Sequence, residues 1–202
     1  MKFVEFDQLL GGQPFFDIGM AAQMTGEPRQ TLRTQLYRWM RSGKLLALRR
    51  GMYAFADSGR HRGINPAALA NFLYRPSYLS TYWALGYYGI IPERVVELTS
   101  ITTRVPREFV NDFGTFRYSN IKQQAFFGYR ATSIDGDKVL LAEPEKALLD
   151  LWHLARGAWN GERMKAMRFQ APEMIDRHRL EDYAAKFRSP RLARAVGVWA
   201  DS

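Results

Sequence analysis

The chain of 202 residues contains no cysteine. This absence excludes disulfides, thiolate metal ligands and cysteine nucleophiles together. The sequence also has no apolar run that approaches the roughly 18 residues of a membrane-spanning helix. Its first residues, MKFVEFDQLL, place acids within a short apolar stretch and show no signal-peptide cleavage site. We therefore expect a cytoplasmic protein that does not associate with a membrane.

Acidic residues are scarce in one segment, residues 28–62. This segment holds nine Lys and Arg residues against the single acid Asp57, a net charge of +8. The whole chain carries +9; ten basic and five acidic residues give residues 1–62 a charge of +5, and residues 63–202 carry +4. Polyanions favour such clusters because phosphate contacts release condensed counterions. The segment therefore predicts a nucleic-acid partner.

Helix signals and turn signals alternate before the basic hairpin. Asp17 fits as the N-cap of a helix that continues to Thr25, and Gly26 supplies the turn that follows. Pro28 suits the start of a second helix, which ends at Ser42–Gly43. We expect the inward faces to be Ile18, Ala21, Ala22 and Met24 in the first helix, and Leu32, Leu36, Trp39 and Met40 in the second.

Two short strands follow, at residues 45–48 and 52–55, joined by the basic turn Arg49-Arg50-Gly51. Two helices followed by such a hairpin are typical of a winged helix-turn-helix. We therefore predict that residues 1–62 form a DNA-binding domain of this type.

The remaining residues, 63–202, predict a mixed helix and β-sheet domain that ends in helices. A small, polar and basic linker is expected at Ser58–Gly63. The predicted helices cover residues 66–74, 78–88, 143–156, 173–187 and 190–199. The predicted strands cover residues 95–103, 115–121, 127–134 and 138–142. The fold class of the whole chain is therefore predicted to be α+β.

The exposed face of the second N-terminal helix is the candidate DNA-reading surface. A recognition helix presents its N-terminal residues to base edges, so the base-edge candidates are Arg29, Gln30, Arg33 and Thr34. The phosphate candidates are Arg38, Arg41 and Lys44, with Tyr37 at the flank and Arg49 and Arg50 on the wing. The alternative for this surface is a solvated basic helix face that has no partner.

Other residues that could take part in catalysis or metal binding are better explained by structural roles. The motif EPEKALLD reads as a helix start, with Pro144 in the first turn and an i,i+4 ion pair between Lys146 and Asp150. Asp135-Gly-Asp137 reads as a hairpin turn. The histidines His61, His153 and His178 lack metal-ligand spacing. We therefore expect no metal, no cofactor and no catalytic site; the alternative is a metal-dependent nucleic-acid enzyme that uses Asp137, Glu143 and Glu145.

Aromatic side chains gather between residues 74 and 88. Core packing is the favoured explanation, because aromatic rings dominate core burial. Stacking of single-stranded bases or an exposed partner surface is the alternative. The residues concerned are Tyr74, Tyr78, Tyr82, Trp83, Tyr87 and Tyr88.

The order of several motifs resembles a known family. The chain shows LRRGMYA after the two N-terminal helices, then SYLSTYWALGYYGII, LLAEPEKALLDLWHL and LEDYAAKFRSPRLARAV. In this it is similar to the AbiEi family, the antitoxins of type IV toxin–antitoxin systems. The resemblance implies an N-terminal domain that represses its own operon at inverted repeats. It also implies a C-terminal domain that counters a nucleotidyltransferase-like toxin encoded nearby; a stand-alone transcriptional regulator is the alternative.

Overall fold

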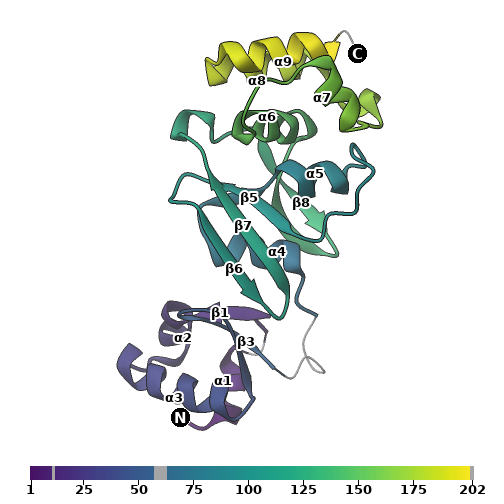
Figure 1. The fold of residues 1–202 in the computed structure, drawn as a ribbon. Helices are drawn as coiled ribbons and strands as arrows, with labels where there is room; N and C mark the ends of the chain where they lie inside the picture. Colours follow the sequence, from purple (N-terminus) through teal and green to yellow (C-terminus); the bar gives the residue numbers. More distant parts are fainter. Residues whose placement is uncertain (11, 57–62, 201–202) are drawn as a thin grey trace. The chain divides into compact units, whose positions relative to one another are not determined.

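The computed structural model describes residues 1–10, 12–56 and 63–200 (Figure 1). It divides into two compact units, the first formed by Met1–Asn65 with Asn111–Phe113, and the second by Pro66–Val110 with Gly114–Ser202. Both helices and sheets are present, so the prediction of an α+β fold is confirmed. The linker expected at Ser58–Gly63 lies outside the described residues except for Gly63. No helix in the described part is long and apolar enough to cross a membrane.

The first unit contains three helices and a three-stranded antiparallel sheet in its described residues. The sheet has the strand order β1-β3-β2. The predicted helices and the hairpin are found. Strand β1 was not predicted, because it is only three residues long and shows no alternation of apolar and polar residues. The elements are α1 (Phe3–Leu10), β1 (Phe15–Asp17), α2 (Ile18–Thr25), α3 (Arg29–Arg41), β2 (Leu45–Arg49) and β3 (Met52–Phe55).

An aromatic and aliphatic core holds the first unit together. Phe6 lies at its centre, with ring centroids 4.8 Å from Trp39 and 5.4 Å from Phe16. Most of the expected inward residues of α2 and α3 are buried or partly buried in this cluster. Met24 is the exception, with 40% of its surface exposed. It lies in the last turn of α2, where the chain turns away through Gly26 (φ 69).

The second unit combines a six-stranded sheet with helices (Figure 1). The strand order is β6-β7-β5-β4-β9-β8. The helices are α4 (Pro66–Leu73), α5 (Thr81–Tyr87), α6 (Pro144–Leu154), α7 (Gly161–Ala166), α8 (Arg177–Phe187) and α9 (Pro190–Ala200). The strands are β4 (Ser77–Leu79), β5 (Leu98–Thr102), β6 (Arg107–Asn111), β7 (Gly114–Asn120), β8 (Tyr129–Ile134) and β9 (Asp137–Ala142).

The sequence did not predict the strands β4 and β6, the helix α7 or the short 3-10 helix at Gln123–Ala125. The helix expected over residues 78–88 begins only at Thr81, because Ser77–Leu79 form a strand. This strand pairs antiparallel with β5 and parallel with β9, and all three of its residues are buried. A strand buried on both faces shows no alternation of apolar and polar residues, so its sequence resembles the start of a buried helix.

A fully buried ion pair lies within α6 and is connected to β4 by a hydrogen bond from Tyr78. The predicted pair between Lys146 and Asp150 exists, but neither side chain has exposed surface. Asp150 Oδ2 also accepts hydrogen bonds from the Tyr78 hydroxyl (3.0 Å) and the Ser80 hydroxyl (2.8 Å). Burial lowers the pKa of Lys146, and the nearby Asp150 carboxylate opposes that change. Burial also raises the pKa of Tyr78, so its hydroxyl remains a donor to Asp150.

Replacement of Asp150 by alanine should strongly destabilise the second unit. The change leaves Lys146 without its counter-charge and the Tyr78 hydroxyl without its acceptor. Loss of one partner of a buried pair costs about 3–5 kcal/mol. Urea unfolding of the full chain measures this loss. Glu181→Ala is the matched control: it removes the acid of the exposed pair with Arg177, which should cost less than about 1 kcal/mol. Equal urea midpoints for the two variants would contradict the assignment.

Candidate nucleic-acid interface

Helix α3 exposes one broad face to solvent and packs its opposite face against the core of the first unit. Of its thirteen residues only Leu32 and Leu36 are buried, both with 0% exposed surface. These two leucines lie four positions apart and fix the rotation of the helix against the core. The predicted residues on α3 are all exposed: Arg29, Gln30, Arg33, Thr34, Tyr37, Arg38 and Arg41.

The two ends of α3 differ in how their backbone polar groups are capped. At its start, Pro28 precedes the helix without a side-chain cap, and no acid lies in the first turn. At its end, the backbone N–H groups of Ser42 and Lys44 donate to the carbonyls of Arg38 (3.0 Å) and Trp39 (2.9 Å). An open N-terminus of this kind favours anions, because free N–H groups and the helix dipole both attract negative charge.

The turn between β2 and β3 carries the second group of predicted residues. Gly51 has φ 78, a left-handed conformation that suits glycine, and its carbonyl accepts from the Ile18 N–H at 3.1 Å. This bond ties the turn to the first residue of α2. Arg50 is exposed and Arg49 is half-buried, with its guanidinium donating to the Arg50 carbonyl (3.3 Å). The hydrogen bond from Ile18 could not be predicted from the sequence.

Most of the basic side chains on this surface have no carboxylate partner. Within the part of the chain that the structure describes, no ion pair involves Arg29, Arg33, Arg38, Arg41, Lys44 or Arg50. The exposed Lys44 ammonium lies 4.9 Å from the centre of the Phe3 ring. Burial raises the pKa of Tyr53, and the positive charge of Arg33 counteracts part of that change. Within the described residues, these six side chains therefore leave the surface with uncompensated positive charge.

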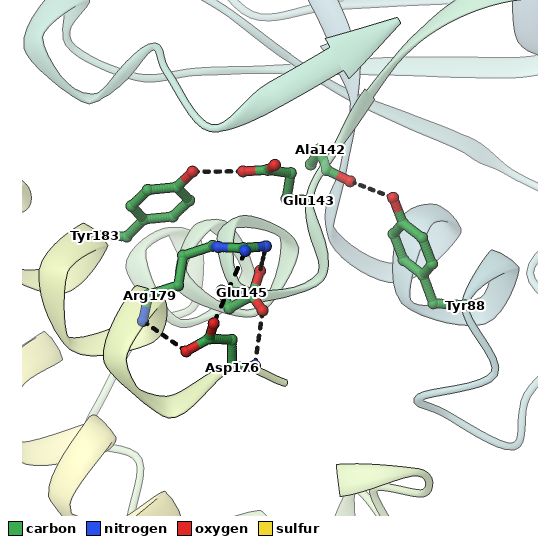
Figure 2. A network of polar contacts seen from close by, with 7 residues as sticks. All are labelled: Tyr88, Ala142, Glu143, Glu145, Asp176, Arg179 and Tyr183. Carbon is green, nitrogen blue, oxygen red and sulfur yellow. Dashed lines mark hydrogen bonds and ion pairs between the residues drawn. The ribbon is translucent and has the colours of Figure 1, made fainter. Parts of the chain in front are cut away.

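Two acids of the alternative enzymatic interpretation, Glu143 and Glu145, are engaged in structural contacts (Figure 2). Glu145 is 1% exposed, and its Oε1 accepts from the backbone N–H of Asp176 at 2.8 Å. The hydroxyl of Tyr183 donates to Glu143, and burial together with this contact raises the pKa of Tyr183 to about 12. Asp137 begins β9 and Glu143 follows its end, so the two lie roughly 20 Å apart along an extended strand. The structure does not bring the three acids together.

The six aromatic residues between positions 74 and 88 divide into three groups, one of which, Trp83 and Tyr88, is partly buried. Tyr74 and Tyr78 are buried, as expected for core residues. Tyr82 and Tyr87 are 43% and 45% exposed, so the expectation of core packing is wrong for them. Helix α5 packs against α6 and β5 and buries Thr81, Ala84 and Leu85, whereas these two tyrosines lie on its outer side.

Comparisons with known proteins concern the fold. Protein-family models and curated proteins give no match to the sequence. Among solved structures, the chain is similar to the crystal structure of the RV2827C protein from Mycobacterium tuberculosis, with a TM-score of 0.56 and 14% sequence identity. The alignment covers 96% of this chain and 75% of that chain. At this identity the likeness shows a shared fold and carries no further assignment.

Replacement of Leu36 by alanine should loosen the attachment of α3. Leu36 is fully buried in the core of the first unit, and such a truncation costs about 2–5 kcal/mol. Hydrogen exchange of the α3 amides in the full chain measures the effect locally. Thr34→Ala, on the exposed side of the same helix, is the control and should change exchange little. Unchanged protection in the Leu36 variant would mean that this residue does not hold the helix.

Proposed function

We propose that the first unit is a winged helix-turn-helix domain that binds duplex DNA and represses transcription of its own operon. The order α1-β1-α2-α3-β2-β3 supports this proposal, because the turn at Gly26 joins α2 to α3 and a hairpin follows. The observation that carries it is the exposed and unneutralised basic surface of α3. Six basic side chains that have no carboxylate partner among the described residues, all on one small unit, are suited to a row of phosphates.

In the proposed complex, α3 lies in the major groove. Its first turns place Arg29, Gln30, Arg33 and Thr34 at base edges, where arginine and glutamine read guanine and adenine. Arg38, Arg41 and Lys44 bind backbone phosphates near the end of the helix, with Tyr37 beside them. Arg49 and Arg50 reach the neighbouring backbone or minor groove from the wing.

We further propose that the protein is an AbiEi-like antitoxin. The support is the resemblance in motif order, which implies repression at inverted repeats and protection against a nucleotidyltransferase-like toxin. The second unit would supply that protection, and no catalytic step is assigned to it. A stand-alone transcriptional regulator is the alternative; an adjacent gene for a nucleotidyltransferase-like protein favours the antitoxin, and the lack of one favours the regulator.

The first test of the proposal separates base reading from phosphate binding. Arg33→Ala should weaken binding to the operator upstream of the gene by about 1–3 kcal/mol and change binding to scrambled duplex much less. Arg50→Ala should weaken both complexes to a similar degree. Fluorescence anisotropy with labelled duplexes measures all four affinities.

Arg194→Ala is the matched control for this test, because Arg194 is an exposed arginine on α9 of the second unit. It should leave both affinities unchanged. Equal affinity of the wild-type protein for operator and scrambled duplex would contradict the assignment of α3 to base reading.

The second test separates repression from toxin neutralisation. The double variant Arg33→Ala/Arg38→Ala should lose repression of an operator-controlled reporter. It should still protect growth when it is co-expressed with the product of the adjacent toxin gene, since neither substitution lies in the second unit. Loss of both activities, with the variant present at normal amounts, would mean that protection acts through DNA binding.

A further inference from the structure

A small aromatic pocket lies on the outer side of α5 in the second unit. Its volume is about 200 Å³, and its walls are Trp83, Gly86, Tyr87, Glu93, Arg94 and Val95. The rings of Trp83 and Tyr87 stack with centroids 5.7 Å apart and planes 10° from parallel. Val96, the next residue along the chain, has 79% of its surface exposed. Apolar surface is therefore concentrated at a place that belongs neither to the proposed DNA-binding surface nor to the buried core.

The pocket is rigidly built. The Thr99 hydroxyl accepts from the Trp83 N–H (3.1 Å) and donates to the Ser80 carbonyl (2.8 Å), which fixes the start of α5. The floor is tight, because a Cβ atom at Gly86 would lie 3.4 Å from both the Glu93 carbonyl and Val95 Cγ2. A ligand would thus meet a preformed surface and lose little free energy to ordering it.

The two charged residues at the rim of the pocket differ in whether they form an ion pair. The Glu93 carboxylate forms an ion pair with the Arg168 guanidinium at 2.7 Å, and this contact lowers the pKa of the Glu93 carboxyl group. Arg94 is exposed and has no ion pair within the described residues. One guanidinium therefore remains available beside the apolar walls, and a carboxylate is the complementary group.

We propose that this pocket is a docking site for an acidic segment of another protein. One apolar side chain of the segment enters between Tyr87 and Val95, and a neighbouring Asp or Glu binds Arg94. The volume fits one such side chain, since cavities of roughly 150 Å³ hold a benzene-sized group. Tyr, Trp and Arg are also the residues that contribute most at protein interfaces.

Single-stranded nucleic acid is a poorer match for the same surface. Bases stack on free aromatic faces beside a groove of cations that follows the backbone. Here Trp83 and Tyr87 stack on each other, and Arg168 is paired with Glu93, which leaves Arg94 as the single uncompensated charge among the lining residues.

The experiment selects a library of randomised short peptides on the immobilised full chain and measures the enriched peptides by fluorescence polarisation. The expected motif is an apolar residue followed closely by Asp or Glu. Tyr87→Ala and Arg94→Glu should each weaken binding by about tenfold or more. Arg94→Glu should bind better to a peptide in which Lys replaces the acid, a reversal that a folding defect would not produce. Arg107→Glu, an exposed arginine on β6, is the control and should leave binding unchanged.

Four outcomes would overturn the proposal. The first is that no apolar–acidic motif is enriched, and the second is that Tyr87→Ala leaves peptide binding unaffected. The third is that the chain binds oligo(dT) and that the same variants lose this binding. The fourth is that the wild-type chain self-associates and that Tyr87→Ala abolishes the self-association. DNA binding is measured in parallel on operator duplex. The docking site and the proposed DNA-binding function can therefore fail independently.

Discussion

The buried ion pair between Lys146 and Asp150 constrains the architecture of the second unit. Two charges taken out of water are tolerated only where their remaining polar atoms are satisfied. Tyr78 and Ser80 satisfy Asp150, and the Phe187 ring lies 4.9 Å from the Lys146 ammonium. The hydrogen bond from Tyr78 to Asp150 therefore connects α6 to β4, which lies between β5 and β9 in the six-stranded sheet.

Residues near this ion pair are also constrained by the close packing around it. Gly128 (φ 69) lies so close to Lys146 that a Cβ atom would be 3.1 Å from its Cβ and Cγ atoms and 2.9 Å from Tyr183 Cε2. Glu145 reaches the start of α8 through the Asp176 N–H. The motif EPEKALLD, on which the family resemblance partly rests, thus joins the sheet, α6 and α8 by packing and hydrogen bonds, without an exposed reactive group.

The sequence predicted the long and periodic elements well and the short ones poorly. The apolar spacing of Leu32 and Leu36 predicted both α3 and its exposed face, and the pair Lys146–Asp150 followed from its helical spacing. Its complete burial could not be predicted, because it depends on Tyr78 in β4, a buried strand without alternation. Exposure of Tyr82 and Tyr87 likewise depends on which side of α5 meets the sheet, a matter that aromatic composition does not decide.

We propose that the basic surface of the first unit binds DNA phosphates, and the salt dependence of binding is the measurement that distinguishes this from a solvated basic face. Five side chains are assigned to phosphates, Arg38, Arg41, Lys44, Arg49 and Arg50. Five contacts predict that log K falls against log salt with a slope of about −4 to −5, and that Arg38→Ala reduces the slope by about one. A slope near zero, or the same slope in the variant and the wild type, would contradict the account.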